Sequence, residues 1–280
     1  RTILLAGVCL LLFSWMAPMS GYALNFVRYV DVGLGNDGAT PQGLAHGIDA
    51  WKTLHYAIDA INSLLDSEGD TCILHVASGV YTFNDGSEPN SPIIIQKDSL
   101  TIDGADSTKP IIDGSTATSW RDGLQIGDET YSPSNVVIKD LVLRNFLSDR
   151  SGIRIENGSN NAIESCEIHS NQYGVHILST GNGNQVRNGC SIHDNSKGIY
   201  IDGSSPEISS NTIYDNEFNI AVTADSLQTA SPTIKDNLIY DGLGEVTAVS
   251  YGIIIGGSGT VSPKIYHNTI NGGLYNGIYM

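Results

Sequence analysis

Apolar and polar residues alternate along most of this chain in short runs of three to five residues. Gly, Asn, Asp, Ser and Pro separate the runs, and these residues favour turns. Alternation with a period of two is typical of β-strands, and runs this short cannot form helices of about ten residues or more. The pattern therefore predicts an all-β protein made of short strands.

The runs also recur along the chain. The stretch "SPTIKDNLIYD" at 231–241 is preceded by "SSPEISSNTIYDN" and followed by "SPKIYHNTING". One apolar residue, which we call the marker, occupies the same place in each copy. Val142 occupies the corresponding place earlier in the chain. The markers are Ile168, Ile192, Ile213, Ile239 and Ile270. Their spacing of 21 to 31 residues, counted from Val142, indicates stacked supersecondary units.

A second run of the form Gly-Ile-x-Ile follows most markers, so each unit holds about three strands. This run begins at Gly152, Gly174, Gly198, Asn219, Gly252 and Gly277. A leucine-rich repeat needs a Leu spacing that is missing here, and a propeller needs tight hairpins. The remaining solution is a coil in which each strand pairs in parallel with its counterpart, about 4.8 Å along the axis. The sequence predicts a single-stranded parallel β-helix.

Residues of equal phase should then stack in columns, with the marker isoleucines pointing inward. One inward column lies two residues before the markers and comprises Asp140, Cys166, Cys190, Asn211, Asn237 and Asn268. A second marks the next bend and comprises Asn145, Asn171, Asn195 and Asn216. Inward asparagines can satisfy turn backbone and the amides above and below them, so we predict asparagine ladders.

Two irregularities interrupt the repeat. Val186 lies six residues before Ile192, whereas Ile163 lies five before Ile168, so one coil should carry an extra residue. The longer gap around "GLGEVTA" indicates an inserted loop. Insertions in stacked repeats fall on loops, often on the binding side.

The N-terminal part differs from the repeats. We expect a secretory signal peptide at 1–23, an N-terminal cap at 24–69 and coils at 70–280 that are truncated at the C-terminal end. The cap contains the one convincing helical pattern. Its apolar face comprises Leu54, Ala57, Ile58, Ile61, Leu64 and Leu65. Such a helix can cover the open end of a coil, where core and strand edges would otherwise be exposed.

Composition narrows the possible partners. The chain has 14 basic and 30 acidic residues and a net charge of -16, which argues against a nucleic-acid partner. The N-terminal apolar run is too short to span a bilayer, so we expect no membrane span and a secreted, extracellular, periplasmic or cell-surface location. Cys166 and Cys190 stack in one column about 4.8 Å apart, which is within disulfide range, but their parallel side chains are poor geometry for a bridge. We expect both to be reduced and buried, and Cys72 to lie in the core.

The opening segment and the coils that follow it both resemble a known family. The opening "YVD...NDG...WKTLHYAID...GDT...VASGVYT" (29–82) and the following N-x-I-x-x-N and G-I-x-I coils are similar to exported right-handed parallel β-helix proteins of the pectate lyase-like superfamily. The resemblance covers nearly all of 29–280. It implies a right-handed coil, and a superfamily of lyases, hydrolases, epimerases and members without known activity.

Outward columns are the candidate sites. His169, His193, Tyr214 and Tyr240 follow the markers and could bind a sugar chain through stacked rings; the alternative is ordinary strand propensity. Arg154, His176 and Tyr200 occupy the Gly-Ile-x-Ile runs. These residue types could neutralise a uronate carboxylate and transfer protons, as catalytic β-elimination requires; the alternative is a solvated surface without a special role.

Carboxylates form a third column. Asp194, Asp215 and Asp241 lie in successive coils, where strict alternation would bury three charges, so we expect the chain to bend and expose them. Turn capping is one interpretation. The other is a metal site, for which oxygen ligands favour calcium. The outward acids that calcium-dependent lyases of the family display are not reproduced, because Ser191 and Thr212 follow Glu167 at equal phase.

The sequence therefore predicts a secreted β-helix protein that binds an acidic polysaccharide and could cleave it by β-elimination with calcium. The alternative is a non-catalytic module that binds glycans or has a structural role at a surface.

Overall fold

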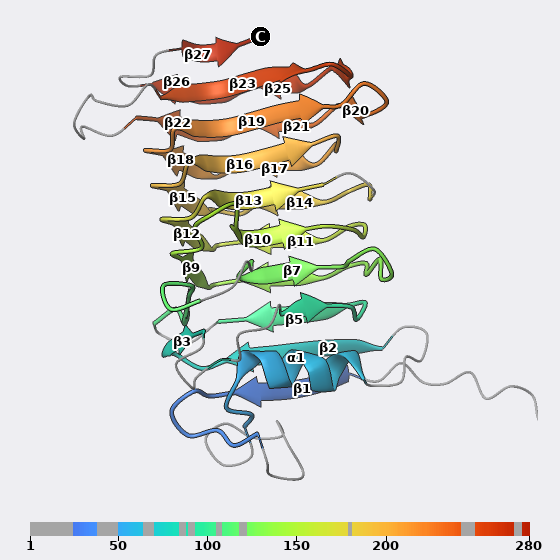
Figure 1. Cartoon of the computed structure of the whole chain (residues 1–280), viewed down its shortest axis with the longest axis vertical. Helices are drawn as coiled ribbons and strands as arrows, with labels where there is room; N and C mark the ends of the chain where they lie inside the picture. The colour runs from blue at the N-terminus through green and yellow to red at the C-terminus, as the bar shows by residue number, and fades with distance from the viewer. Residues whose placement is uncertain are drawn as a thin grey trace, which may run out of the picture.

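The strands of this computed structural model stack as successive turns of one coil (Figure 1). The structure describes residues 25–37, 50–63, 70–83, 88, 93–104, 108–117, 122–178, 181–241, 250–271 and 276–280. The predicted signal peptide, Leu64 and Leu65 of the helix pattern, and the loop around "GLGEVTA" lie outside these residues.

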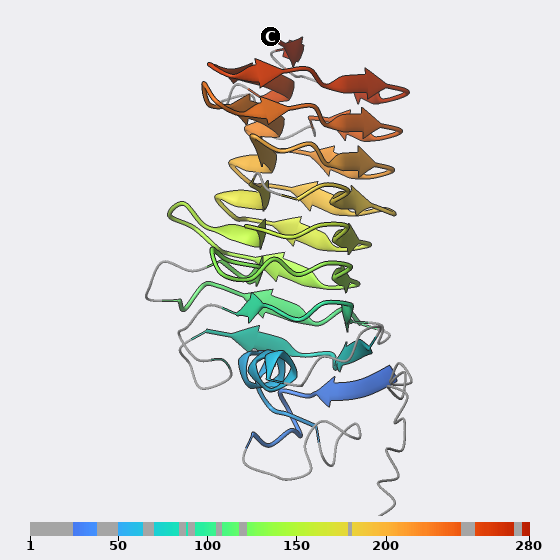
Figure 2. The ribbon, with the colours of Figure 1, turned by 90° about the vertical axis from the view of Figure 1, so that its right-hand side faces the viewer.

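Three sheets run along the coil, and their strands pair in parallel (Figures 1 and 2). The first sheet comprises β1 (Asn25–Val30), β2 (Thr71–Val76), β5 (Leu100–Asp103), β8 (Val137–Lys139), β11 (Ala162–Glu164), β14 (Gln185–Arg187), β17 (Glu207–Ser209), β21 (Thr233–Lys235) and β25 (Lys264–Tyr266). The second comprises β3 (Val80–Thr82), β6 (Ile111–Asp113), β9 (Val142–Arg144), β12 (Glu167–His169), β15 (Ser191–His193), β18 (Thr212–Tyr214), β22 (Leu238–Tyr240) and β26 (Thr269–Asn271). The third comprises β4 (Ile94–Ile95), β7 (Leu124–Ile126), β10 (Ser151–Ile155), β13 (Tyr173–Ile177), β16 (Lys197–Asp202), β19 (Phe218–Ala224), β23 (Tyr251–Gly257) and β27 (Asn276–Tyr279). Short strands β20 (Thr229–Ala230) and β24 (Thr260–Val261) pair beside them.

The register of the second sheet confirms the predicted repeat. Ile213 pairs with Ile239, which pairs with Ile270 in the next coil. Ile213 and Ile239 are fully buried in the interior. Burying an isoleucine side chain contributes about 1.5 to 3 kcal/mol, so one such column stabilises every coil it crosses.

The predicted phase is wrong by one residue in the earlier coil. Ile168 pairs with Leu143 rather than Val142. Leu141 therefore occupies the place predicted for Asp140, and Phe146 the place predicted for Asn145. Asp140 and Asn145 have φ of 58° and 65°, and this left-handed conformation turns the chain at both ends of the strand.

Both asparagine ladders are present in the later coils. In one, the backbone N–H of Asn171 donates to Asn195 Oδ1 at 3.0 Å, and that of Asn195 donates to Asn216 Oδ1 at 2.9 Å. In the other, Asn211 donates in the same way to Asn237 at 3.0 Å. The side-chain amides also donate to buried carbonyls, so the ladders satisfy backbone groups at the bends.

The predicted extra residue is also found. Ile163 pairs with Val186 and Ile168 with Ile192, so the link between these strands is one residue longer in the later coil. Asn188 and Gly189 both adopt positive φ there, at 60° and 83°. Two consecutive left-handed residues absorb the insertion without disturbing the register of either sheet.

Helix α1 (Leu54–Asn62) lies at the N-terminal end of the stack (Figure 1). Leu54, Ala57, Ile58 and Ile61 are buried and join the core, as the apolar spacing predicts. The Thr53 hydroxyl accepts from the Tyr56 N–H at 3.1 Å as the N-cap. The buried Glu88 carboxylate accepts from the backbone N–H groups of Leu54 and His55, where a negative charge complements the helix dipole.

The three described cysteines are free and buried, as predicted. Cys166 Sγ and Cys190 Sγ each contact a backbone carbonyl oxygen of the interior, at 3.7 Å and 3.6 Å. Burial raises the pKa of Cys190 to about 12, and it raises that of Cys166 as well. These thiols therefore act as small core side chains.

Candidate functional site

The structure divides the predicted site residues between two faces of the coil. His169, His193, Tyr214 and Tyr240 lie in the second sheet. Arg154, His176 and Tyr200 lie in the third sheet. Each column has the register predicted for it, but the bend between the sheets separates the two columns. We call them the second-sheet column and the third-sheet column.

The rings of the second-sheet column stack almost face to face. The ring centroids of His169 and His193 are 5.0 Å apart, those of His193 and Tyr214 4.7 Å, and those of Tyr214 and Tyr240 5.0 Å. The planes differ by 4°, 14° and 3°. This geometry follows from parallel pairing, because the coil spacing of about 4.8 Å is close to a ring-stacking distance.

Acidic groups flank the second-sheet column. His193 Nδ1 lies 2.7 Å from an oxygen of Asp194, and its Nε2 lies 3.6 Å from Glu167. Burial, followed by the nearby Asp215 carboxylate, raises the pKa of Asp241. Burial and the adjacent His193 lower the pKa of His169. This face therefore suits a neutral or cationic ligand better than an anionic one.

The predicted bend is present at Asp194 and Asp215. Asp194 and Asp215 have φ of 54° and 53°, which takes their side chains out of the wall. Asp194 is exposed, but its carboxylate contacts His193, while Asp215 neighbours Asp241. Within the described ranges, no group of three or more His, Cys, Asp or Glu side chains is arranged to hold a metal ion. A calcium site at Asp194, Asp215 and Asp241 stays a prediction.

The third-sheet column continues beyond the predicted residues. Tyr200 pairs with Ala221, then Ile254 and Tyr279 follow in successive coils. A neighbouring row on the same face, which the sequence prediction missed, comprises Tyr173, Lys197, Phe218 and Tyr251. We call the column and this row together the third-sheet strip.

His176 is enclosed within the third-sheet strip. Its side chain is 7% exposed and stacks on Tyr200 at 4.7 Å, with the Tyr173 ring at 5.2 Å. Neither ring nitrogen has a hydrogen-bond partner among the described residues. Burial, then Arg154 and Lys197, lowers the pKa of His176 to about 3. The imidazole is therefore neutral near pH 7, and it is a weak base.

Two cations border these rings. Lys197 Nζ lies 3.9 Å from the centroid of Tyr200 and 5.0 Å from that of Tyr173. Both distances are within the range of cation–π attraction. Arg154 Nε contacts the Glu156 carboxylate on the same strand. The Tyr200 hydroxyl accepts a hydrogen bond from Thr223 Oγ1 at 3.1 Å.

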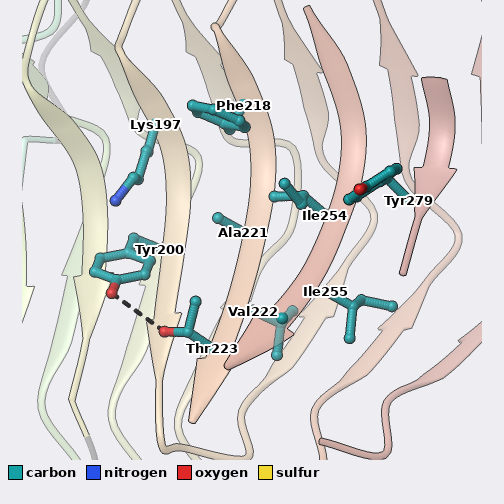
Figure 3. A pocket seen from close by; sticks show the side chains of 10 residues that line it. Lys197, Tyr200, Phe218, Ala221, Val222, Thr223, Ile254, Ile255 and Tyr279 are labelled. Atoms are coloured by element: carbon teal, nitrogen blue, oxygen red, sulfur yellow. Dashed lines mark hydrogen bonds between the residues drawn. The ribbon is translucent and has the colours of Figure 1, made fainter. Parts of the chain in front are cut away.

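A pocket of about 240 Å³ lies at the C-terminal part of the third-sheet strip (Figure 3). Its walls include Lys197, Phe218 and Tyr200 on one side and Ile254 and Tyr279 on the other, with the short Ala221 side chain between them (Figure 3). The pocket exists because alanine occupies a place where its neighbours in the column carry large side chains.

Comparisons place this geometry in a family. Residues 98–270, more than half of the chain, match the family model described as "Right handed beta helix region". The chain belongs to this family, and its fold is that of the pectate lyase-like superfamily, as the sequence motifs predicted. The coil is therefore right-handed. Comparison with curated proteins gives no significant match.

Several solved structures are similar. Pectate lyase Pel9A has a TM-score of 0.53 at 11% identity, over 92% of this chain and 80% of that one. A rhamnogalacturonan lyase has a TM-score of 0.52 at 14% identity, over 84% and 74%. The ORF18 protein of Geobacillus virus E2 has a TM-score of 0.49 at 16% identity; the match covers 90% of this chain but 62% of the viral one. Identities this low bear on the fold alone.

No helix in the described ranges is both long and apolar enough to cross a membrane.

Proposed function

We propose that the third-sheet strip binds an acidic polysaccharide. The observation that carries the proposal is Lys197, whose ammonium lies over two tyrosine rings and forms no ion pair among the described residues. Sugars bind through ring faces and hydroxyl partners, and a uronate carboxylate pairs with a cation. The third-sheet strip supplies both kinds of contact on one surface.

The two faces differ in their cations, because Lys197 has the carboxylates of Glu217, Asp202 and Asp149 in its surroundings but forms an ion pair with none of them among the described residues. Arg154 and Lys197 lie two coils apart, in a protein whose net charge is -16. The second-sheet column instead adjoins Glu167, Asp194 and the neighbouring Asp215 and Asp241, which would repel a polyanion. The ring stack of the second sheet remains a candidate for neutral sugars.

Cleavage by β-elimination is a second candidate function. It needs a group that accepts a proton beside a uronate and a cation that neutralises the carboxylate. The Tyr200 hydroxyl, positioned by Thr223, lies on the ring that Lys197 approaches, so these residues suit the two roles by position. The catalytic roles of Arg154 and His176 remain predictions, and the low pKa of His176 makes it the weaker candidate base.

Binding by the third-sheet strip predicts a charge-dependent affinity. We expect Lys197→Met and Arg154→Gln each to weaken binding of polygalacturonate or alginate about 10- to 100-fold, because each removes a charge-assisted hydrogen bond. Added salt should weaken wild-type binding as well. Calorimetric titration measures the affinities, and thermal melting shows that each variant is folded.

Tyr214→Ala is the matched control on the second sheet. It removes one ring of the second-sheet column, so affinity for the acidic polymers should stay at the wild-type value. A loss of affinity in Tyr214→Ala alone would move the site to the second sheet and contradict the proposal.

Absorbance of unsaturated products, followed with and without calcium, tests cleavage in the same samples.

A non-catalytic structural or surface module is the remaining alternative. A purely structural module would bind none of polygalacturonate, alginate or glycosaminoglycans, and a module that only binds glycans would bind them without releasing unsaturated products. We also propose that the protein is secreted. Residues 1–23 have the pattern of a signal peptide, and the proposed polysaccharide ligand would be encountered outside the cytoplasm.

A further inference from the structure

We propose that Thr223 and Asp202 relay a proton away from Tyr200 when Tyr200 takes a proton from a bound sugar. This relay serves cleavage by β-elimination, the second candidate function, and rests on it. Asp202 is the final proton acceptor. Thr223 and Asp202 are positioning residues in this scheme, because both act on the sugar through Tyr200.

Two hydroxyl groups and one carboxylate form a chain on the outer face of two adjacent strands. Tyr200 and Asp202 alternate with the buried Ile201 in β16, so both face outward. Thr223 of β19 pairs with Asp202 from the next coil. Thr223 Oγ1 lies 3.1 Å from the Tyr200 hydroxyl oxygen (Figure 3) and 3.4 Å from Asp202 Oδ1. The ring nitrogens of His176 have no hydrogen-bond partner among the described residues, so that imidazole is not part of the chain.

Tyr200 needs such a partner to act as a base. A tyrosine hydroxyl is protonated at neutral pH, so it can accept a proton from a sugar only if it gives up its own. The Thr223 hydroxyl has one proton to donate and two lone pairs. When it donates to Asp202, a lone pair is free to accept the proton of Tyr200. Donation to a carboxylate is favoured over donation to a neutral hydroxyl, so the chain has a direction that leads away from Tyr200.

Protons and electrons balance over these steps. The proton on the carbon beside the uronate carboxylate moves to Tyr200, that of Tyr200 to Thr223, and that of Thr223 to Asp202, which becomes neutral. The electron pair of the broken C–H bond forms the carbon–carbon double bond. The glycosidic oxygen leaves with its bonding pair and takes a proton from water. The resulting hydroxide removes the proton from Asp202 and restores the starting state.

The surroundings of Asp202 suit a proton acceptor. Burial, followed by the nearby Asp225 carboxylate, raises the pKa of Asp202. The hydrogen bond from Thr223 and the charges of Lys197 and Arg154 oppose this rise without cancelling it. A carboxylate with a raised pKa is a better proton acceptor than an ordinary one.

The experiment measures the release of unsaturated products from polygalacturonate and alginate by the full chain and by isosteric variants. We expect Thr223→Val and Asp202→Asn each to lower kcat about 100-fold without raising KM, because each breaks the relay and neither side chain contacts the sugar. Thr223→Ser keeps the hydroxyl and should retain most of the activity. Thermal melting shows that each variant is folded.

Asp225→Asn is the control for the pH dependence. The wild-type kcat should fall as the pH falls through the pKa of Asp202, because the protonated acid cannot accept another proton. Asp225 raises that pKa, so its replacement should move this fall to lower pH. At neutral pH the kcat of Asp225→Asn should equal the wild-type value.

Three results would overturn the relay and leave elimination standing: unchanged kcat in Thr223→Val, unchanged kcat in Asp202→Asn, or normal cleavage by Tyr200→Phe. A wild type that binds the polymers but releases no unsaturated products would overturn elimination and the relay together. Binding by the third-sheet strip would stand in that case, so the two failures are distinguishable.

Discussion

Replacement of Asn195 by alanine should destabilise the protein by about 3 to 5 kcal/mol. Asn195 Oδ1 accepts from the backbone and side-chain amides of Asn171, both at 3.0 Å. Its Nδ2 donates to the carbonyl of Ile168 at 3.1 Å and to Asn216 Oδ1 at 2.9 Å. The side chain is 3% exposed, so water cannot replace it and each buried group left unpaired costs about 1 to 3 kcal/mol.

Asn182→Ala is the matched control for this change. Asn182 is exposed, and its backbone carbonyl accepts from the Asn160 N–H at 2.9 Å, a bond that alanine retains. Its substitution should alter the free energy of unfolding by no more than about 0.5 kcal/mol. Urea denaturation of both variants measures the difference. Equal stability of the two variants would show that the ladder does not hold the coils together.

The sequence predicted the fold well where turn chemistry and apolar spacing agreed. In the coils of Ile213, Ile239 and Ile270, a Ser-Pro pair precedes each first-sheet strand, and an Asn two residues before each isoleucine fixes the phase. In the earlier coil Leu141, Val142 and Leu143 are all apolar, so the pattern alone leaves the inward residue undecided. There the left-handed turns at Asp140 and Asn145 set the register.

The site was harder to predict, because the period of two breaks at the glycines. Counting back from Tyr200 by twos reaches Gly198 and misses Lys197, yet Lys197 and Tyr200 both face outward. Gly198 lies against the next coil, where an added Cβ would come within 2.6 Å of the Asn219 carbonyl oxygen. The recurrence of large residues just before each Gly or Asn, at Tyr173, Lys197 and Phe218, was the signal that could have revealed the row.

The break in the alternation at the glycines also shapes the proposed binding surface. Because Gly198 and Ile199 are both buried, the outward residues Lys197 and Tyr200 of this third-sheet strand lie three positions apart instead of two. Lys197 in one row therefore reaches the rings of Tyr173 and Tyr200, in its own row and in the other. The surface that we propose to bind a polyanion thus depends on the buried glycine of the Gly-Ile-x-Ile run, which lies against the next coil.

Acidification should destabilise the wild type through His176, and His176→Phe should remove that effect. The pKa of an unfolded histidine is about 6.5, and that of His176 in the folded chain is lowered to about 3 by burial. Between these values the unfolded chain binds a proton that the folded chain does not. The free energy of unfolding therefore falls as the pH falls through this window, by about 4 to 5 kcal/mol over its whole width.

Comparison of the two proteins isolates this contribution from the carboxylates that titrate in the same range. Phenylalanine keeps a ring between Tyr173 and Tyr200 and removes two buried nitrogens that have no hydrogen-bond partner among the described residues. The variant should thus be at least as stable as the wild type at pH 7, and more stable by about 3 kcal/mol at pH 4. His267→Phe is the control, because that side chain is 76% exposed, and it should follow the wild-type pH curve. Parallel unfolding curves for wild type and His176→Phe from pH 7 to pH 4 would mean that the imidazole is hydrated or paired in solution, and the enclosed ring stack at the centre of the third-sheet strip would have to be revised.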